Sequence, residues 1–355
     1  MKSFLGRAGF ALVILTFFHA PLFGQAIKTP EPTVDQLNQA IQAFSRLGAK
    51  HLAVTDPKTK TTHHHFLMPL STEDNDLKKI PPVPFDFGLN LYFTNVTDAG
   101  LKDIKELKNL TALDLGGTKV TDAGLKEVKR LKSLAILSLR STQVTDAGLK
   151  ELKEIQALST LGLHATSITD AGLKELKELK NLTELDLTAT KVTDVGLKEL
   201  REFKNLTRLS LRSTQVTDAG VKELKELKSL TKLDLNYTQV TDAGLAELKV
   251  LQKLTWLDLF GTKITDAGLK ELKELKNLNT LALGYTQVTN AGLGELKELK
   301  SLNWLDLGGT TITDAGLNEI KDITSLTKLG IGGTSLTDVA LKKLKKHLPD
   351  CQFVR

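Results

Sequence analysis

Residues 182–205 read LTELDLTATKVTDVGLKELREFKN, and residues 206–229 read LTRLSLRSTQVTDAGVKELKELKS. The two segments carry the same residue types at the same offsets. The pattern recurs as eleven consecutive units of 24 residues between Asp86 and Pro349. One such unit cannot bury its apolar side chains alone, so the repetition predicts a solenoid in which each unit stacks on its neighbours.

Each unit has two halves with different periodicities. Leu185 and Leu187 alternate with outward-facing residues, which predicts a short strand. Leu197, Leu200 and Phe203 follow at intervals of three residues, which indicates one face of a helix. The pattern L-x-x-L-x-L-x-x-T-x-V/I-T-D-A-G-L-K-E-L resembles the leucine-rich repeat, with Thr where that family usually has Asn or Cys. The resemblance implies an α/β horseshoe-shaped solenoid with parallel strands on the concave face and short helices on the convex face.

Three further positions recur in nearly every unit, and each has a structural interpretation. A hydroxyl both donates and accepts, so a column of threonines is expected to satisfy backbone groups where each strand ends. The Asp that precedes each helix, replaced once by Asn290, is expected to be its N-cap and not a metal ligand. The Gly two residues later is unfavourable in a helix, so close packing is expected to select it. The threonine column runs through Thr94, Thr118, Thr142 and Thr166 to Thr334.

The segments outside the repeats are expected to cap the solenoid. Within the N-terminal cap, residues 27–85, a helix is predicted over 33–47 with a capping box at Thr33 and Gln36. Strands over 50–55 and 61–67 are expected to pair as a hairpin. His63, His64 and His65 are the only cluster with metal-ligand chemistry, but three adjacent residues on a strand alternate faces, which favours a surface strand. Residues 350–355 are predicted to form a terminating strand.

The first 26 residues have the features of a signal peptide. Lys2 and Arg7 precede an apolar run over 10–18, and Gly24 to Ala26 offer small residues for cleavage. The run is short for a membrane span, although an uncleaved anchor is the alternative. We therefore expect a secreted or cell-envelope protein with no transmembrane helix after signal removal. Cys351 is the only cysteine, so an intramolecular disulfide is excluded.

Charge argues against a nucleic-acid partner. The formal net charge is +6, and removal of Lys2 and Arg7 with the signal leaves 6 − 2 = +4. Columns of Lys and Glu stand side by side on the predicted helices, so their charges cancel locally. The balance favours neither nucleic acid nor an anionic membrane as partner.

Aromatic side chains gather on the outward face of the predicted strands. Equivalent residues of neighbouring units are expected about 4.8 Å apart, so they form columns. Both Trp and all three Tyr residues, Tyr92 included, fall on this face, and most lie between Tyr237 and Trp304. β-propensity alone would spread them over all eleven units. Glycines such as Gly116, Gly117, Gly308 and Gly309 are expected to leave both ends of the face bare. The candidate ligand-binding residues are Trp256, Trp304, Tyr237, Tyr285, Phe260, Arg208, Arg212, Lys232, Asp234, Asp258 and Asp306.

The chemistry of this face favours a protein or peptide partner that carries cationic groups. Asp234 and Asp258 lie on adjacent strands, where like charges are unfavourable without a cation between them. The rings of Trp256 and Trp304 are further acceptors for a cation. The alternative is internal compensation by Arg208, Arg212 and Lys232.

The sequence carries no catalytic constellation, cofactor motif or metal site, so a non-catalytic binding function is predicted. The T-D-A-G-L core is similar to the repeats of F-box leucine-rich-repeat proteins and their bacterial relatives, in the ribonuclease-inhibitor-like superfamily. That resemblance implies a substrate-recognition adaptor of a ubiquitin ligase, but residues 27–85 lack the helical trio of an F-box. The expectation is therefore a secreted bacterial binding protein. A substrate adaptor and a purely structural envelope protein are the alternatives.

Overall fold

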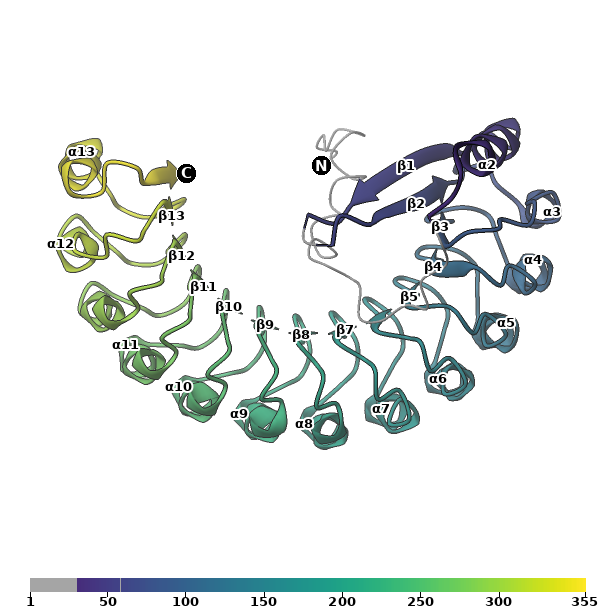
Figure 1. Cartoon of the computed structure of the whole chain (residues 1–355). Coiled ribbons are helices and arrows are strands. Elements are labelled where there is room, and N and C mark those ends of the chain that lie inside the picture. Colours follow the sequence, from purple (N-terminus) through teal and green to yellow (C-terminus); the bar gives the residue numbers. More distant parts are fainter. Residues whose placement is uncertain (1–30, 58) are drawn as a thin grey trace, which may run out of the picture.

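The strands of successive units lie side by side in one continuous sheet that curves into an open arc, with the helices along its outer side (Figure 1). The computed structural model describes residues 31–57 and 59–355, so the predicted signal peptide lies outside the described residues. Within these ranges the sheet has fourteen strands in chain order. The predicted concave sheet and convex helices are confirmed.

The elements are short, as a 24-residue unit requires. The strands are β1 (Lys50–Thr55), β2 (Thr62–Leu67), β3 (Phe87–Asn90), β4 (Leu110–Asp114), β5 (Ile136–Ser138), β6 (Thr160–Gly162), β7 (Glu184–Asp186), β8 (Arg208–Ser210), β9 (Lys232–Asp234), β10 (Trp256–Asp258), β11 (Thr280–Ala282), β12 (Trp304–Asp306), β13 (Lys328–Gly330) and β14 (Gln352–Val354). The α-helices are α2 (Val34–Arg46), α3 (Asp74–Leu77), α4 (Asp98–Ile104), α5 (Asp122–Val128), α6 (Asp146–Leu152), α7 (Asp170–Glu175), α8 (Asp194–Leu197), α9 (Asp218–Glu223), α10 (Asp242–Glu247), α11 (Asp266–Leu269), α12 (Leu317–Ile320) and α13 (Asp338–His347). Several units close with a 3-10 helix: η1 (Lys198–Glu202), η2 (Leu224–Glu226), η3 (Leu248–Val250), η4 (Lys270–Glu274) and η5 (Gly292–Glu298).

The sheet pairs residues that occupy the same position in successive units. Leu209 pairs with Leu233, and Leu233 with Leu257, in parallel register. Because side chains alternate along a strand, this register places every inward leucine over its equivalent in the next unit. Leu233 and Leu257 are fully buried in the core between sheet and helices.

A threonine, not the predicted aspartate, is the N-cap of each helix from α4 to α11. Thr217 is the N-cap of α9, where its side chain accepts a hydrogen bond from the backbone N–H of Ala219. The neighbouring Asp218 is the first helical residue, and its carboxylate accepts two bonds from Thr241 of the next unit, from N at 2.7 Å and from Oγ1 at 2.6 Å. The carboxylate therefore joins two units instead of capping its own helix. We call this pair of bonds the Asp–Thr staple.

The helical glycine makes room for the staple. A Cβ on Gly244 would lie 2.4 Å from Oδ1 of Asp218, and one on Gly220 would lie 2.4 Å from Oδ1 of Asp194. Close packing is thus the reason for glycine at this position. The threonine column acts within each unit: Oγ1 of Thr214 donates to the carbonyl of Leu211 at 2.6 Å.

The N-terminal segment covers the first repeat. Helix α2 begins after Thr33, which forms a capping box with Gln36, and β1 pairs antiparallel with β2. Strand β2 then pairs parallel with β3, so the hairpin extends the sheet of the solenoid. Phe44 stacks on Phe66 with ring centroids 3.8 Å apart, which ties the helix to the hairpin.

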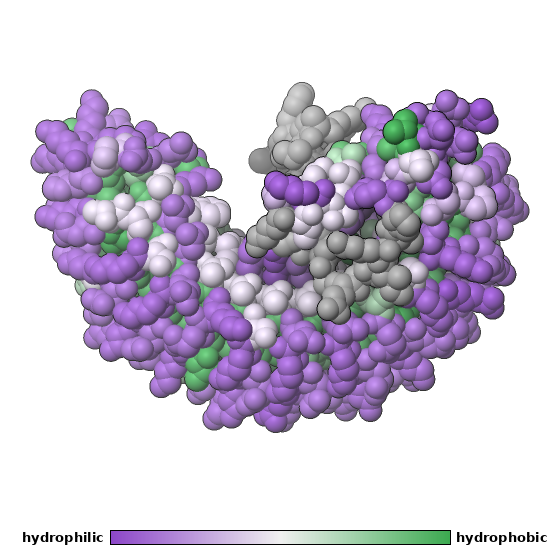
Figure 2. Space-filling view, in the orientation of Figure 1, coloured by the Kyte–Doolittle hydropathy of each residue, from purple (hydrophilic) through white to green (hydrophobic). Residues whose placement is uncertain are grey.

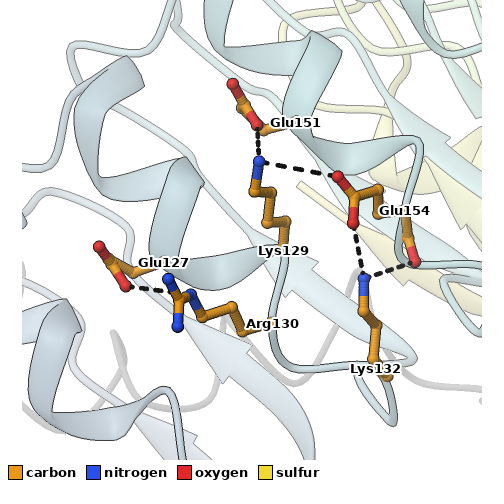
Figure 3. A network of polar contacts seen from close by, with 6 residues as sticks. All are labelled: Glu127, Lys129, Arg130, Lys132, Glu151 and Glu154. Carbon is orange, nitrogen blue, oxygen red and sulfur yellow. Dashed lines mark hydrogen bonds and ion pairs between the residues drawn. The ribbon is translucent and has the colours of Figure 1, made fainter.

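The convex surface is hydrophilic (Figure 2) and is crossed by ion pairs between units. Lys129 Nζ lies 2.7 Å from Glu151 Oε2 and 3.6 Å from Glu154 Oε1, while Lys132 Nζ lies 2.9 Å from Glu154 Oε2 (Figure 3). Exposed pairs of this kind contribute little stability each. The Lys and Glu columns therefore neutralise one another. Among the described residues, no helix is both long and apolar enough to cross a membrane.

Candidate functional site

The outward residues of the sheet form four rows that run across the units. The strand-start row includes Lys232, Trp256 and Trp304, and the carboxylate row includes Asp234, Asp258 and Asp306. The strand-end row contains Arg212 and Phe260, two residues beyond the carboxylate row. The edge row is one residue further and contains Tyr237 and Tyr285. All the candidate residues predicted from the sequence lie in these rows.

The carboxylates of this row accept hydrogen bonds from the backbone of their own units. Oδ1 of Asp234 accepts from the backbone N–H of Asn236 at 3.0 Å, and Oδ1 of Asp258 accepts from that of Phe260 at 2.9 Å. Asp306 makes the same bond to Gly308 at 3.0 Å. Each carboxylate thus closes a turn at the end of its strand. This role was not predicted from the sequence.

Side-chain hydrogen bonds connect residues of four successive units along this row. Ser210 Oγ lies 2.8 Å from Thr188 Oγ1 and donates to Asp234 Oδ2 at 3.0 Å. Asn236 Nδ2 donates to Asp258 Oδ2 at 3.3 Å. Burial and the neighbouring Asp258 carboxylate raise the pKa of Asp234 to about 7. Asp234 is therefore a buried structural group, whereas Asp258 and Asp306 remain partly exposed.

The basic residues of the strand-start row have internal partners. Arg208 forms an ion pair with Glu184 at 3.1 Å, in which both side chains are largely buried. Burial raises the pKa of Glu184 to about 7, against the effects of Arg208 and Lys232. Burial and the Arg208 charge lower the pKa of Lys232. Glu184 thus compensates the charge of Arg208 within the fold, whereas Arg212 is exposed.

Three aromatic rings form a continuous surface where the strands end, which we call the aromatic edge. It consists of Tyr237, Phe260 and Tyr285, with ring centroids 5.5 Å apart for the first pair and 5.0 Å for the second. Tyr237 is 51% exposed and Tyr285 is 63% exposed. Such a contiguous exposed apolar patch is typical of an interaction site.

Both tyrosines adopt a backbone conformation that is unfavourable for them. Their φ angles are 53°, and the equivalent residue has positive φ in every unit, where it is most often Gly, Ala or Ser. A non-glycine residue in the left-handed region costs about 1–2 kcal/mol. The turn dictates this conformation for whichever residue stands there, so the backbone itself does not favour an aromatic side chain.

Each ring at the strand ends lies over a glycine of the next unit. A Cβ on Gly261 would lie 2.6 Å from the ring of Tyr237, and one on Gly309 would lie 2.6 Å from that of Tyr285. Gly284 stands in the same relation to Phe260. The prediction that Gly309 leaves the surface bare is therefore wrong, because this glycine receives a ring.

A second aromatic pair lies in the first repeat. The rings of Tyr92 and Phe93 are 4.4 Å apart, and the Arg140 guanidinium lies 5.2 Å from the Tyr92 ring centroid. Their rings lie over Gly116 and Gly117, which are therefore not bare either. Phe93 is 53% exposed and is not among the binding residues predicted from the sequence.

The histidines of the hairpin lie apart from this surface. His51 Nε2 and His64 Nδ1 are 3.0 Å apart across β1 and β2. Among the residues with a described position, no group of three or more His, Cys, Asp or Glu side chains is arranged to hold a metal ion.

Comparison with known proteins agrees with this architecture. A family model described as "Leucine Rich repeat" matches residues 106–128, 178–200, 204–225, 226–249 and 250–273. The fold is that of a leucine-rich-repeat solenoid. An internalin from Listeria monocytogenes has a similar structure, with a TM-score of 0.57 and 21% identity over 90% of this chain and 94% of that one. Internalin C2 of the same organism has a TM-score of 0.48 and 27% identity over 61% of this chain and 84% of its own. No curated protein matches the chain in sequence.

Proposed function

We propose that this solenoid is a non-catalytic protein-binding scaffold that acts outside the cytoplasm. Its ligand is expected on the concave strand face and the aromatic edge of the middle and later repeats. The solenoid architecture is typical of extended binding surfaces. Residues 31–85 contain one long helix, a hairpin and a short helix, and nothing in this arrangement favours the ubiquitin-ligase adaptor.

One observation carries the proposal: the exposed tyrosines of the aromatic edge occupy left-handed backbone positions. Tyr237 and Tyr285 both have φ of 53° and are more than half exposed. Neither the backbone conformation nor core packing favours an aromatic ring there, so a role outside the fold is the better explanation. Tyrosine is also enriched among the residues that dominate binding energy at protein interfaces.

The extracellular part of the proposal depends on the basic and apolar segment at residues 2–26. Cell fractionation of the full chain should place it outside the cytoplasm. Accumulation in the cytoplasm of the expressing bacterium would contradict this part.

Quantitative capture with the immobilised chain tests the binding function. Proteins retained by the wild type should be depleted with Tyr237→Ala/Tyr285→Ala and with Trp256→Ala/Trp304→Ala. Phe93→Ala is the matched control, because Phe93 occupies the same row in the first repeat, with positive φ and similar exposure. Identical retention by all variants, each with intact circular dichroism, would refute the proposal.

A further inference from the structure

The exposed groups near the aromatic edge repeat every two units and not every unit. Trp256 and Asp258 on β10 recur as Trp304 and Asp306 on β12, whereas β11 between them carries Thr280 and Ala282. In the edge row, Tyr237 and Tyr285 are likewise two units apart, with Gly261 between them. Each of these three rows thus contains one pair of residues two units apart, while Asp234, one unit before Asp258, is buried and falls outside this spacing.

The backbone sets the length of this period. Sheet-like hydrogen bonds continue past the strand ends, from Tyr237 N to the carbonyl of Phe260 and from Gly261 N to that of Gly284, both at 2.8 Å. Neighbouring units therefore remain about 4.8 Å apart, and the two-unit period is about 9.6 Å. A polyproline II helix rises 3.1 Å per residue with three residues per turn, so it repeats every ~9.3 Å. The two periods match within a few tenths of an ångström.

The relief of the aromatic edge suits proline rings. Tyr237 and Tyr285 are exposed, and Phe260 between them is only partly exposed. The three rings are in contact, so the partly exposed Phe260 lies between two more exposed tyrosines. Adjoining aromatic rings line the usual receptors of the polyproline II helix, which loses little entropy on binding.

The carboxylates near the aromatic edge favour a ligand that carries a positive charge. Asp258 and Asp306 are partly exposed in the carboxylate row, two residues before Phe260 and Gly308 of the strand-end row. Asp306 is among the groups that raise the pKa of Asp258, although burial is the main cause. A cation every third residue of a polyproline II segment would face these two carboxylates in turn. A neutral glycan could stack on the same rings, but it would add no cation to Asp258, which Arg212 and the Asn236 amide stabilise only against a larger effect of burial, or to Asp306.

We propose that the aromatic edge binds a proline-rich segment of a partner protein in the polyproline II conformation, with Arg or Lys facing Asp258 and Asp306. This inference rests on the proposed protein-binding function and specifies the chemistry of its ligand.

Calorimetric titration of the full chain with synthetic peptides tests the proposal. The probe is Arg-Pro-Pro repeated five times, which places one arginine on each turn. Tyr237→Ala/Tyr285→Ala should weaken its binding at least about tenfold, the loss typical of two interface aromatics. Asp258→Asn/Asp306→Asn should also weaken it, whereas Phe93→Ala should leave it unchanged.

A second variant disturbs the edge without removing a ring. Gly284→Ala places a Cβ 2.6 Å from the ring of Phe260, at a residue without positive φ. It should weaken peptide binding while the circular dichroism spectrum stays that of the wild type.

Three results would overturn the proposal. They are no binding of the arginine–proline peptide, equal affinity for Arg-Gly-Ser repeated five times, and tyrosine-dependent binding of cellohexaose in place of the peptide. If the peptide does not bind but protein capture still depends on Tyr237 and Tyr285, the polyproline II ligand is refuted. The proposed protein-binding function is then retained.

Discussion

At each turn of the solenoid one aspartate joins two units through the Asp–Thr staple. Asp218→Ala would leave the N–H and hydroxyl of Thr241 without their acceptors. We expect the free energy of unfolding to fall by about 1–3 kcal/mol, as measured by urea denaturation. Asn290 accepts from N of Thr313 at 3.0 Å and donates its Nδ2 to Oγ1 of Thr313 at 2.8 Å. An asparagine thus keeps two bonds to the next unit, so Asp218→Asn should cost less. An equal loss of unfolding free energy in both variants would show that the hydrogen bonds to Thr241 are not the source of the stability.

At the helical glycine position, helix propensity and packing favour different residues. Propensity favours Ala over Gly by up to about 1 kcal/mol, yet a Cβ on Gly244 would meet Asp218 Oδ1 at 2.4 Å. We expect Gly244→Ala to lower the thermal unfolding temperature. Gly294→Ala is the control, because its Cβ would approach only the flexible end of Glu319 at 3.1 Å. Stabilisation by Gly244→Ala would contradict the packing explanation.

Asp234 should make stability depend on pH. Its folded-state pKa of about 7 lies above the ordinary value of 3.8, mainly because of burial. The folded protein thus binds this proton more tightly than the unfolded chain does. The stability it contributes is fully present below about pH 3.8 and is lost as pH rises through about 7. In urea denaturation, Asp234→Asn should gain stability relative to wild type as pH rises from 4 to 8, and a difference independent of pH would refute this.

At the scale of elements, the N-terminal hairpin should respond to pH in the opposite sense. Burial lowers the pKa of His65 to about 4, and it also lowers those of His51, His63 and His64, against opposing effects of Glu31 and Asp56 at some of them. Their contribution is present above pH 6.5 and is lost as pH falls towards 4. The hydrogen-exchange protection factors of β1 and β2, which correct for the slower intrinsic exchange at low pH, should therefore fall below pH 6.5 more than those of β8. A uniform fall in protection would contradict a local cause.

The sequence was a reliable guide to elements and a poorer one to contacts between units. The alternation around Leu185 and Leu187 predicted strand and register, because one unit contains the whole signal. The predicted N-cap of α9 was wrong by one residue, because Thr217 and Asp218 are both residue types that favour this position. Only the stacked structure shows that Asp218 faces the next unit. For the same reason, the sequence did not predict that Asp258 closes a turn or that the ring of Tyr285 packs over Gly309.

At the scale of the whole molecule, the two surfaces of the solenoid differ. Ion pairs between units cross the convex surface, whereas the middle and later repeats present aromatic rings and carboxylates around the strand ends. The 24-residue repeat alone predicts that these residues lie in neighbouring columns, and their two-unit spacing is present in the sequence. Their left-handed backbone is visible only in the three-dimensional structure.

Site-specific photocrosslinking tests the central claim of partner binding at the aromatic edge most directly. A benzoylphenylalanine replaces Tyr285 on this edge or, in a second variant, Val195, which is 60% exposed on convex helix α8. On irradiation with the captured partner, the probe at 285 should form the covalent adduct and the probe at 195 should not. An adduct from position 195 with none from position 285 would contradict the account.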